Sequence, residues 1–150
     1  MKESVVYSFL PKERDDGGLL HEGELAYGTE KPFVEVLRAG FPMSEFHCLQ
    51  ELVAVSEEDL GRLVGISPAT LHRRKKTGRL DTPESERVVR IARLFGMSME
   101  VFETKEAARE WLKCEHPGLA DESPLSYMDT EFGAREVENL LGRIDHGVFS

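Results

Sequence analysis

The feature that most constrains the fold is a pair of closely spaced helix starts in the middle of the chain. Ser56 precedes three acidic residues and an apolar face, and Ser67-Pro68 opens a second helix shortly afterwards. Ser is a favoured N-cap residue and Pro a favoured first helical residue, while Gly65 suits the turn between the helices. The spacing therefore predicts two crossed helices joined by a tight turn, a helix-turn-helix.

Apolar residues at helical spacing recur on both sides of this pair, without strand alternation longer than a few residues. We therefore expect an all-α fold, with an arm over 1–31, a helix-turn-helix domain over 32–96 and a small helical domain over 97–150. The arm should be extended or partly disordered, with a short element at Val5–Leu10. Further helix starts are expected at Pro32, Ser44, Thr82, Thr104 and Thr130, and helix ends at Gly40, Gly78 and Gly96.

Composition restricts the class of protein. Hydrophobic residues make up 40% and charged residues 31%, as in ordinary globular chains, and no apolar run approaches the length of a membrane span. Cys48 and Cys114 are far apart, and the start of the chain lacks the apolar stretch of a secretory signal. We expect a cytoplasmic protein with free thiols, no membrane contact, no metal site and no cofactor.

The charge is unevenly distributed along the chain. The net charge is −9, which for a whole chain argues against nonspecific binding to nucleic acid. Residues 62–93, however, contain nine Lys and Arg against three Asp and Glu, and both flanking segments are acidic. This basic segment indicates an anion-facing patch, although a solvated helix face would have the same charge.

In a helix-turn-helix, the start of the second helix reaches base edges in the major groove, and its later cations meet phosphates. Gly61 provides the small residue that lets the first helix approach the second. Direct readout is expected to centre on Thr70 and Arg73. The full set of predicted DNA-binding residues is Ser67, Thr70, Arg73, Arg74, Lys75, Lys76 and Arg79.

Arg74 departs from the pattern, because such motifs usually hold an apolar residue at this position. We expect either that the second helix leans outward or that the Arg74 stem covers the core. A plain αα-hairpin is the alternative to a DNA reader, because cations in a last helical turn also complement the helix dipole.

The last helix is amphipathic and is followed by a short apolar end. Val137, Leu141 and their helical neighbours face a core or a partner, and Gly147-Val148-Phe149 follow with no residues left to bury them. A partner's cleft would bury this tail, and a small glycine beside a cation suits a pocket that normally receives a phosphate-bearing ligand such as NAD. Folding of the tail back onto the helix is the alternative.

Catalysis has little support in the sequence. Cys114-Glu115-His116 is the only candidate for a nucleophile and base, and neighbours on one turn rarely reach each other productively. Two possible soft ligands do not make a structural zinc site. We expect no enzyme activity and no catalytic residues, and we interpret Trp111 as a core residue.

Four ordered blocks carry a resemblance to a known family. They are TLHRRKKTGRL, ESERVVRIARLF, AAREWL with PGLADESPLSYM, and GAREVENLLGRIDHGVF. Together they cover about two thirds of the chain, and on them the sequence resembles the Xre/MbcA/ParS family of type II antitoxins.

The resemblance implies a Xre-like DNA-binding helix-turn-helix followed by a domain that binds RES-domain toxins, which degrade NAD. It further implies a homodimer that binds its toxin and represses its own operon at operator DNA. The C-terminal segment would cover the toxin's active site, through Arg143, Ile144, His146, Gly147, Val148 and Phe149.

A stand-alone helix-turn-helix regulator without a toxin partner is the alternative function. In that case the C-terminal helices would only dimerise the protein or sense a ligand. A co-purified partner, or a RES-domain reading frame beside the gene, would favour the antitoxin.

Overall fold

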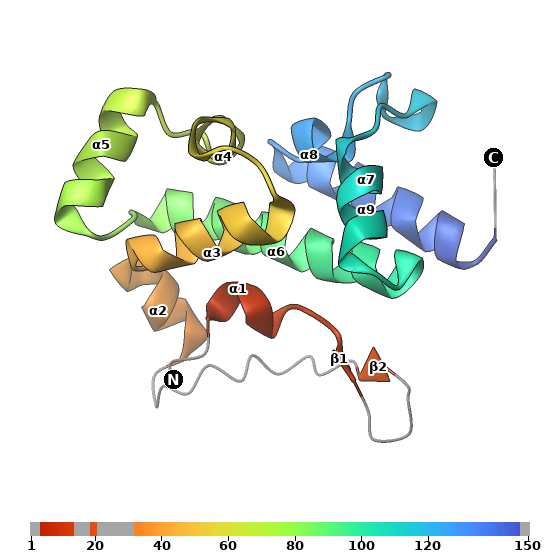
Figure 1. The fold of residues 1–150 in the computed structure, drawn as a ribbon, viewed down its shortest axis with the longest axis horizontal. Coiled ribbons are helices and arrows are strands. Elements are labelled where there is room, and N and C mark those ends of the chain that lie inside the picture. Colours follow the sequence, from red (N-terminus) through yellow and green to blue (C-terminus); the bar gives the residue numbers. More distant parts are fainter. Residues whose placement is uncertain (1–3, 14–18, 21–31, 148–150) are drawn as a thin grey trace.

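The computed structural model describes residues 4–13, 19–20 and 32–147, and within them confirms the helical fold class (Figure 1). The sequence analysis did not predict the short antiparallel strand pair in which Lys12 lies opposite Leu20. The elements are α1 Val5–Ser8, β1 Lys12–Glu13, β2 Leu19–Leu20, α2 Phe33–Ala39, α3 Met43–Val53, α4 Glu57–Val64, α5 Pro68–Thr77, α6 Thr82–Phe102, α7 Lys105–Lys113, the 3-10 turn η1 Pro117–Leu119, α8 Pro124–Tyr127 and α9 Glu131–Asp145.

Helix α6 is the central element of the fold. It packs against α1, α2, α3 and α4 on the helix-turn-helix side and against α7 and α9 on the C-terminal side (Figure 1). Val88, Leu94 and Phe95 have no exposed surface, so α6 supplies the core of both parts. One helix therefore positions the nucleic-acid candidate residues and the C-terminal helices relative to each other.

The predicted end of this helix at Gly96 is wrong, because α6 continues to Phe102. Gly96 lies where the chain after α1 crosses α6, and a Cβ atom there would overlap the Phe9 carbonyl oxygen. The glycine thus serves a close backbone approach in the interior of a helix and is not a helix end. That partner lies 87 residues away in sequence, so no local pattern could have indicated it.

The side-chain caps were predicted with mixed success. Ser56, Ser67, Thr104 and Thr130 each accept a hydrogen bond from the backbone N–H three residues later, as expected. Two predicted starts are wrong. Helix α3 begins after Pro42 and not at a Ser44 cap, and α6 is capped by Asp81, in a reciprocal capping box with Glu84, and not by Thr82.

The predicted element near the N-terminus is present as α1, and it is packed firmly. The buried carboxylate of Glu45 accepts hydrogen bonds from the Ser4 hydroxyl at 2.7 Å and from the Val5 and Val6 N–H groups at 3.0 and 3.1 Å. Val5 and Val6 have no exposed surface. Val5 and Val6 therefore belong to the core, whereas residues 14–18 and 21–31 of the expected arm lie outside the described residues.

No helix among the described residues has both the length and the apolar character needed to cross a membrane.

The Gly96 crossing yields a stability prediction. Changing Gly96→Ala should lower the free energy of unfolding by about 1–3 kcal/mol, because the methyl group must displace the Phe9 backbone. Gly142→Ala is the matched control, since nothing lies within 4 Å of a Cβ there and Ala should stabilise the helix by up to about 1 kcal/mol. Urea unfolding followed by circular dichroism measures both, and equal stability of G96A and the unchanged chain would contradict the crossing.

Candidate functional site

Helices α4 and α5 form the predicted helix-turn-helix. Gly65 ends α4 in the left-handed region with φ of +77°, and the Ile66 N–H donates to the Gly61 carbonyl at 2.7 Å. Leu60, Val64, Ile66 and Leu71 are buried between the two helices and α6. The turn is fastened to α6, because the Arg87 guanidinium donates to the Val64 carbonyl at 3.1 Å.

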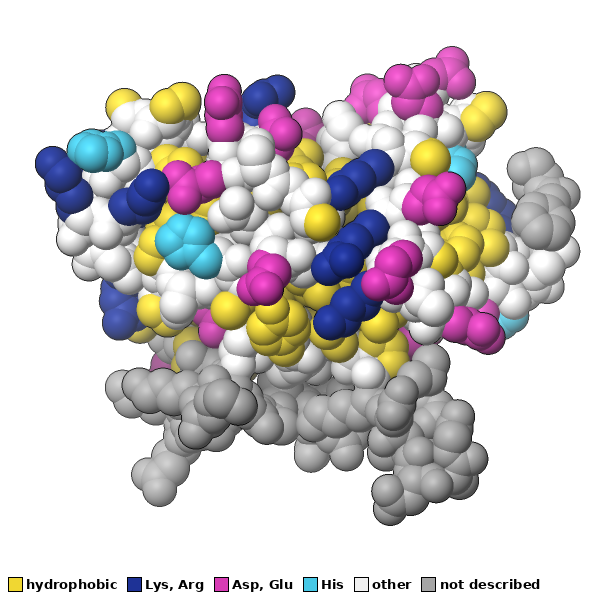
Figure 2. Space-filling model, viewed as in Figure 1, with side chains coloured by type: hydrophobic (Ala, Val, Ile, Leu, Met, Phe, Trp, Pro, Cys, Tyr) yellow, Lys and Arg dark blue, Asp and Glu magenta, His cyan; other side chains and the backbone are white. Residues whose placement is uncertain are grey.

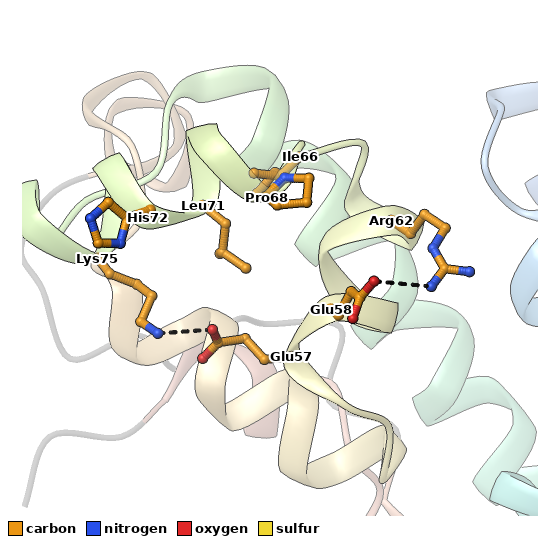
Figure 3. Close-up of a pocket in the computed structure, with 8 residues that line it drawn as sticks. All are labelled: Glu57, Glu58, Arg62, Ile66, Pro68, Leu71, His72 and Lys75. Carbon is orange, nitrogen blue, oxygen red and sulfur yellow. Dashed lines mark hydrogen bonds and ion pairs between the residues drawn. The ribbon is translucent and has the colours of Figure 1, made fainter.

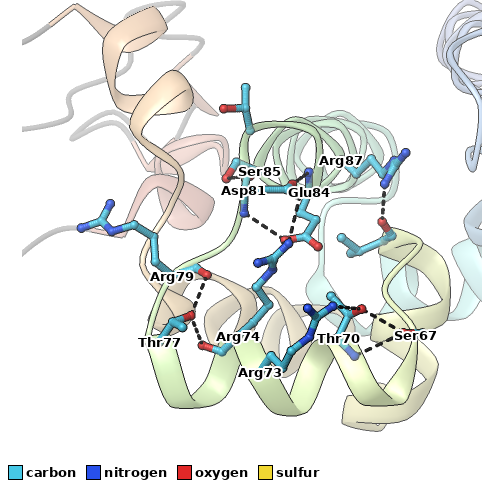
Figure 4. Close-up of polar contacts among 12 residues, drawn as sticks. Ser67, Thr70, Arg73, Arg74, Thr77, Arg79, Asp81, Glu84, Ser85 and Arg87 are labelled. Carbon is cyan, nitrogen blue, oxygen red and sulfur yellow. Dashed lines mark hydrogen bonds and ion pairs between the residues drawn. The ribbon is translucent and has the colours of Figure 1, made fainter.

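Arg74 points inward and holds α5 on the start of α6 (Figure 4). Its Nε donates to Glu84 Oε1 at 2.8 Å and its terminal nitrogen to Asp81 Oδ2 at 3.2 Å. Glu84 is only 5% exposed, and its hydrogen bond with Arg74 raises the pKa of the guanidinium. This ion pair explains the departure from an apolar residue at this position, because the cation neutralises the Asp81 and Glu84 carboxylates at the start of the next helix.

Two more predicted DNA-binding cations have partners inside the chain. Lys75 Nζ lies 2.9 Å from Glu57 Oε1, and this hydrogen bond is the main cause that holds the pKa of Glu57 below its ordinary value. Arg79 donates to the Gly40 carbonyl at 2.6 Å and so ties the end of α5 to the end of α2. These contacts reduce the number of cations that α5 can direct at phosphates without rearrangement.

The remaining predicted residues lie together on the exposed side of α5. The Arg73 guanidinium donates to the Thr70 hydroxyl at 3.1 Å, and the Ser67 hydroxyl donates to the same oxygen at 3.0 Å (Figure 4). Lys76 is exposed and has no ion-pair partner among the described residues. His72, which the sequence analysis did not include, is exposed next to Arg73 and one helical turn before Lys76.

A hollow of about 450 Å³ separates α4 from α5 (Figure 3). Ile66, Pro68 and Leu71 make its apolar wall. Glu57 and Glu58 line it from the first turn of α4, and each is paired with a cation that also lines it, Lys75 and Arg62 respectively. The hollow therefore has both signs of charge along its border, and His72 lies there as well.

The C-terminal helices are fastened to the helix-turn-helix part by side chains of α7. Arg109 donates to the Leu52 carbonyl at 2.7 Å, and Lys113 to the Ala54 carbonyl at 2.7 Å, at the C-terminus of α3. Cations are favourable there because a helix C-terminus carries partial negative charge. Figure 2 shows a row of basic side chains over α7, and Lys105 continues the same i, i+4 spacing.

Helix α9 packs its apolar side on α6 and leaves the opposite side in solvent. Val137 and Leu141 are buried, and the Arg93 guanidinium lies 3.2 Å from Glu138 Oε2. Of the predicted toxin-binding residues, Arg143 and Ile144 are partly buried at the end of α9, and His146 and Gly147 are exposed after it. The other two, Val148 and Phe149, lie outside the described residues.

The residues considered for catalysis and their neighbour Trp111 differ in their exposure to solvent. Trp111 is 9% exposed and packs between the rings of Phe102 and His116, which confirms it as a core residue. Cys114 is exposed, whereas the His116 ring lies against Trp111 and its Nε2 atom is buried without a hydrogen-bond partner. No group of three or more His, Cys, Asp or Glu side chains in the described part of the chain could hold a metal ion.

Two family models match the chain in the order of these two parts. The Antitoxin Xre-like helix-turn-helix domain matches residues 32–93, and the Antitoxin Xre/MbcA/ParS C-terminal toxin-binding domain matches residues 98–147. Both matches meet within α6, which is the helix that the two parts share.

Relatives along most of the chain are antitoxins. Antitoxin Xre of Photorhabdus laumondii is 33% identical over 117 residues, which are 77% of this chain and 79% of the relative. Antitoxin Xre of Yersinia enterocolitica is 34% identical over 119 residues, 78% and 80% of the two chains. A Prs ADP-ribosylating antitoxin of a Sphingobium species is 24% identical over 127 residues, 78% and 80% of the two chains.

The inward position of Arg74 can be tested through Glu84. Glu84→Ala should lower the free energy of unfolding by about 2–4 kcal/mol, because it removes the capping box and leaves a half-buried guanidinium with only Asp81. Lys75→Ala is the control, since its partly exposed pair with Glu57 should contribute less than about 1 kcal/mol. Denaturant unfolding at neutral pH compares the two, and similar losses would show that the Arg74–Glu84 pair is not structural.

Proposed function

The chain belongs to the Xre/MbcA/ParS family of antitoxins and has the family's toxin-binding domain, and from this premise we propose that it inhibits a RES-domain toxin that degrades NAD. The segment from Arg143 to Phe149 covers the active site of that toxin. The observation that carries the proposal is the exposed end of α9: His146 and Gly147 are in solvent at the end of a helix whose other side is fixed in the core.

The local geometry at this end suits insertion into a pocket. Gly147 has a φ of +69°, so the chain turns away from the helix axis directly after His146. Arg143 and His146 border a shallow hollow, so a basic rim precedes the apolar residues of the tail. A pocket that accepts NAD must accommodate phosphates, and cations beside a small residue are suited to such a pocket.

We further propose that the helix-turn-helix binds operator DNA and represses the antitoxin's own operon. Thr70 and Arg73 meet base edges, and Lys76 meets a phosphate. Ser67 caps α5 at its N-terminus, where backbone N–H groups favour an anion. Three further cations hold α5 in place through contacts inside the protein. Their partners are Glu84 for Arg74, Glu57 for Lys75 and the Gly40 carbonyl for Arg79.

A homodimer is part of this proposal. A single copy presents few unpaired cations on α5, and the chain carries a net charge of −9, so affinity per copy should be low. Two copies on adjacent half-sites, one DNA turn apart, would raise the affinity through a high effective concentration. A cytoplasmic location is part of the same proposal, because both proposed partners, operator DNA and the toxin, are expected there.

The alternative function is a helix-turn-helix regulator that has no toxin partner. The family's toxin-binding domain favours the antitoxin. A pull-down of the native partner, followed by an assay of that partner for NAD consumption, separates the two functions.

The proposed role of the tail predicts a selective loss of inhibition. Deleting residues 147–150 should relieve inhibition of the RES-domain toxin while helical content and thermal stability stay unchanged, because α9 ends at Asp145. A chain that lacks only Ser150 is the matched control. NAD consumption by the toxin measures the effect, and full inhibition by the shortened chain would remove the tail from the mechanism.

The proposed DNA surface predicts which cations matter. Arg73→Ala should weaken operator binding by about 1–3 kcal/mol, and Lys76→Ala should lower the salt slope by about one. Lys105→Ala, an exposed change of equal charge on α7, is the control and should leave both quantities unchanged. Fluorescence anisotropy at several salt concentrations gives the affinities for operator DNA. Equal binding curves for the three variants would show that the DNA contact lies elsewhere.

A further inference from the structure

Phe132 is the most exposed large hydrophobic side chain in the described part of the chain. It is 80% exposed in the first turn of α9, whereas Val34 and Tyr7, the next two, are 53% and 37% exposed. Within residues 98–147, the range of the toxin-binding domain, no other described residue is a large hydrophobic with such exposure. Phe132 thus contributes almost no packing to its own fold.

The backbone that carries this ring is nevertheless rigid. On one side of it, Glu131 pairs with Arg90 of α6 at 3.2 Å. On the other side, the Gly133 N–H donates to the Thr130 hydroxyl at 3.0 Å, and a Cβ at Gly133 would overlap the Tyr127 carbonyl oxygen. An aromatic side chain held in solvent by a fixed backbone is pre-organised for a partner, because little conformational freedom of the backbone is lost on binding.

The same outer side of α9 contains a hollow near the end of the helix. The hollow measures about 440 Å³ and is lined by Glu138, Asn139, Gly142, Arg143 and His146. Glu138 is already paired with Arg93, whereas Arg143 has no ion-pair partner among the described residues. The surplus charge of the hollow is therefore positive, and its complement is a carboxylate.

Phe132 and Arg143 lie on one stripe of the helix. Eleven residues are close to three helical turns, so the two side chains point the same way at a separation of about 16 Å along the axis. Asn139 lies between them, at i+7 from Phe132. The stripe ends where the C-terminal segment begins, so it is continuous with the proposed inhibitory tail.

We propose that this stripe is a second contact with the toxin, beside the toxin's catalytic mouth, with Arg143 at the boundary between the stripe and the tail. Phe132 enters an apolar recess on the toxin, and the hollow around Gly142 receives an acidic side chain that pairs with Arg143. This inference rests on the proposed function, since it assumes the same partner. In this proposal, the stripe supplies affinity for the toxin, and the tail inhibits the toxin's activity.

The test measures affinity and inhibition separately, with the full chain and the purified RES-domain toxin. Phe132→Ala should raise the dissociation constant for the toxin about tenfold or more, yet still reach full inhibition at saturating concentration, because the tail is intact. Val34→Ala, the same kind of truncation on α2, is the control and should change neither quantity. Thermal unfolding of F132A should match that of the unchanged chain, because the ring is mostly in solvent.

A second variant probes the hollow without touching the ring. Gly142→Leu fills the hollow, and nothing in the chain lies within 4 Å of the added Cβ, so it should weaken toxin binding while the fold is retained. A dissociation constant for F132A equal to that of the unchanged chain would overturn the inference. So would a loss of self-association in F132A with unchanged toxin affinity, because a second copy would then occupy the stripe. If the unchanged chain does not bind the toxin at all, the proposed function itself fails.

Discussion

The structure depends on the continuity of α6 through both family-matched parts. Its buried face supplies core residues from Val88 to Phe95, and the crossing at Gly96 lets the N-terminal segment lie against it. Arg109 and Lys113 of α7 then reach back to the carbonyl groups that end α3. Because these contacts connect the helix-turn-helix to the toxin-binding part, the outer sides of α5 and α9 are held in a fixed relation.

Several cations of the basic segment over residues 62–93 have partners inside the protein. Most of its cations are used within the fold: Arg74 on Glu84, Arg87 on the α4 turn, and Arg90 and Arg93 on α9. A count of charges along the chain cannot distinguish a cation that faces a phosphate from one that faces a carboxylate of the same protein. On α5, Arg73 and Lys76 are the cations without a carboxylate partner among the described residues.

Local signals in the sequence were sufficient for much of the fold. Caps such as Ser67 and Thr130 act on the next helical turn, so their effect can be predicted from neighbouring residues. The predictions fail where a segment that is distant in the sequence determines the local structure. Gly96 is explained by Phe9, and Glu45, with no local sign of burial, caps a helix 40 residues away. Of the predicted DNA-binding residues, Thr70, Arg73 and Lys76 follow the local helical pattern of α5, whereas the inward turn of Arg74 depends on Glu84 of α6.

Helix α9 shows how one element can serve stability and recognition without conflict between them. Val137 and Leu141 hold its inner side in the core, while Phe132 is 80% exposed on the opposite side and Arg143 is partly exposed near the end of the helix. Recognition residues on such a surface can vary with the partner at little cost in stability, since the inner side alone fixes the helix. We therefore expect the residues that distinguish one toxin from another to lie on this outer side. The buried residues of α9 determine only the position of the helix.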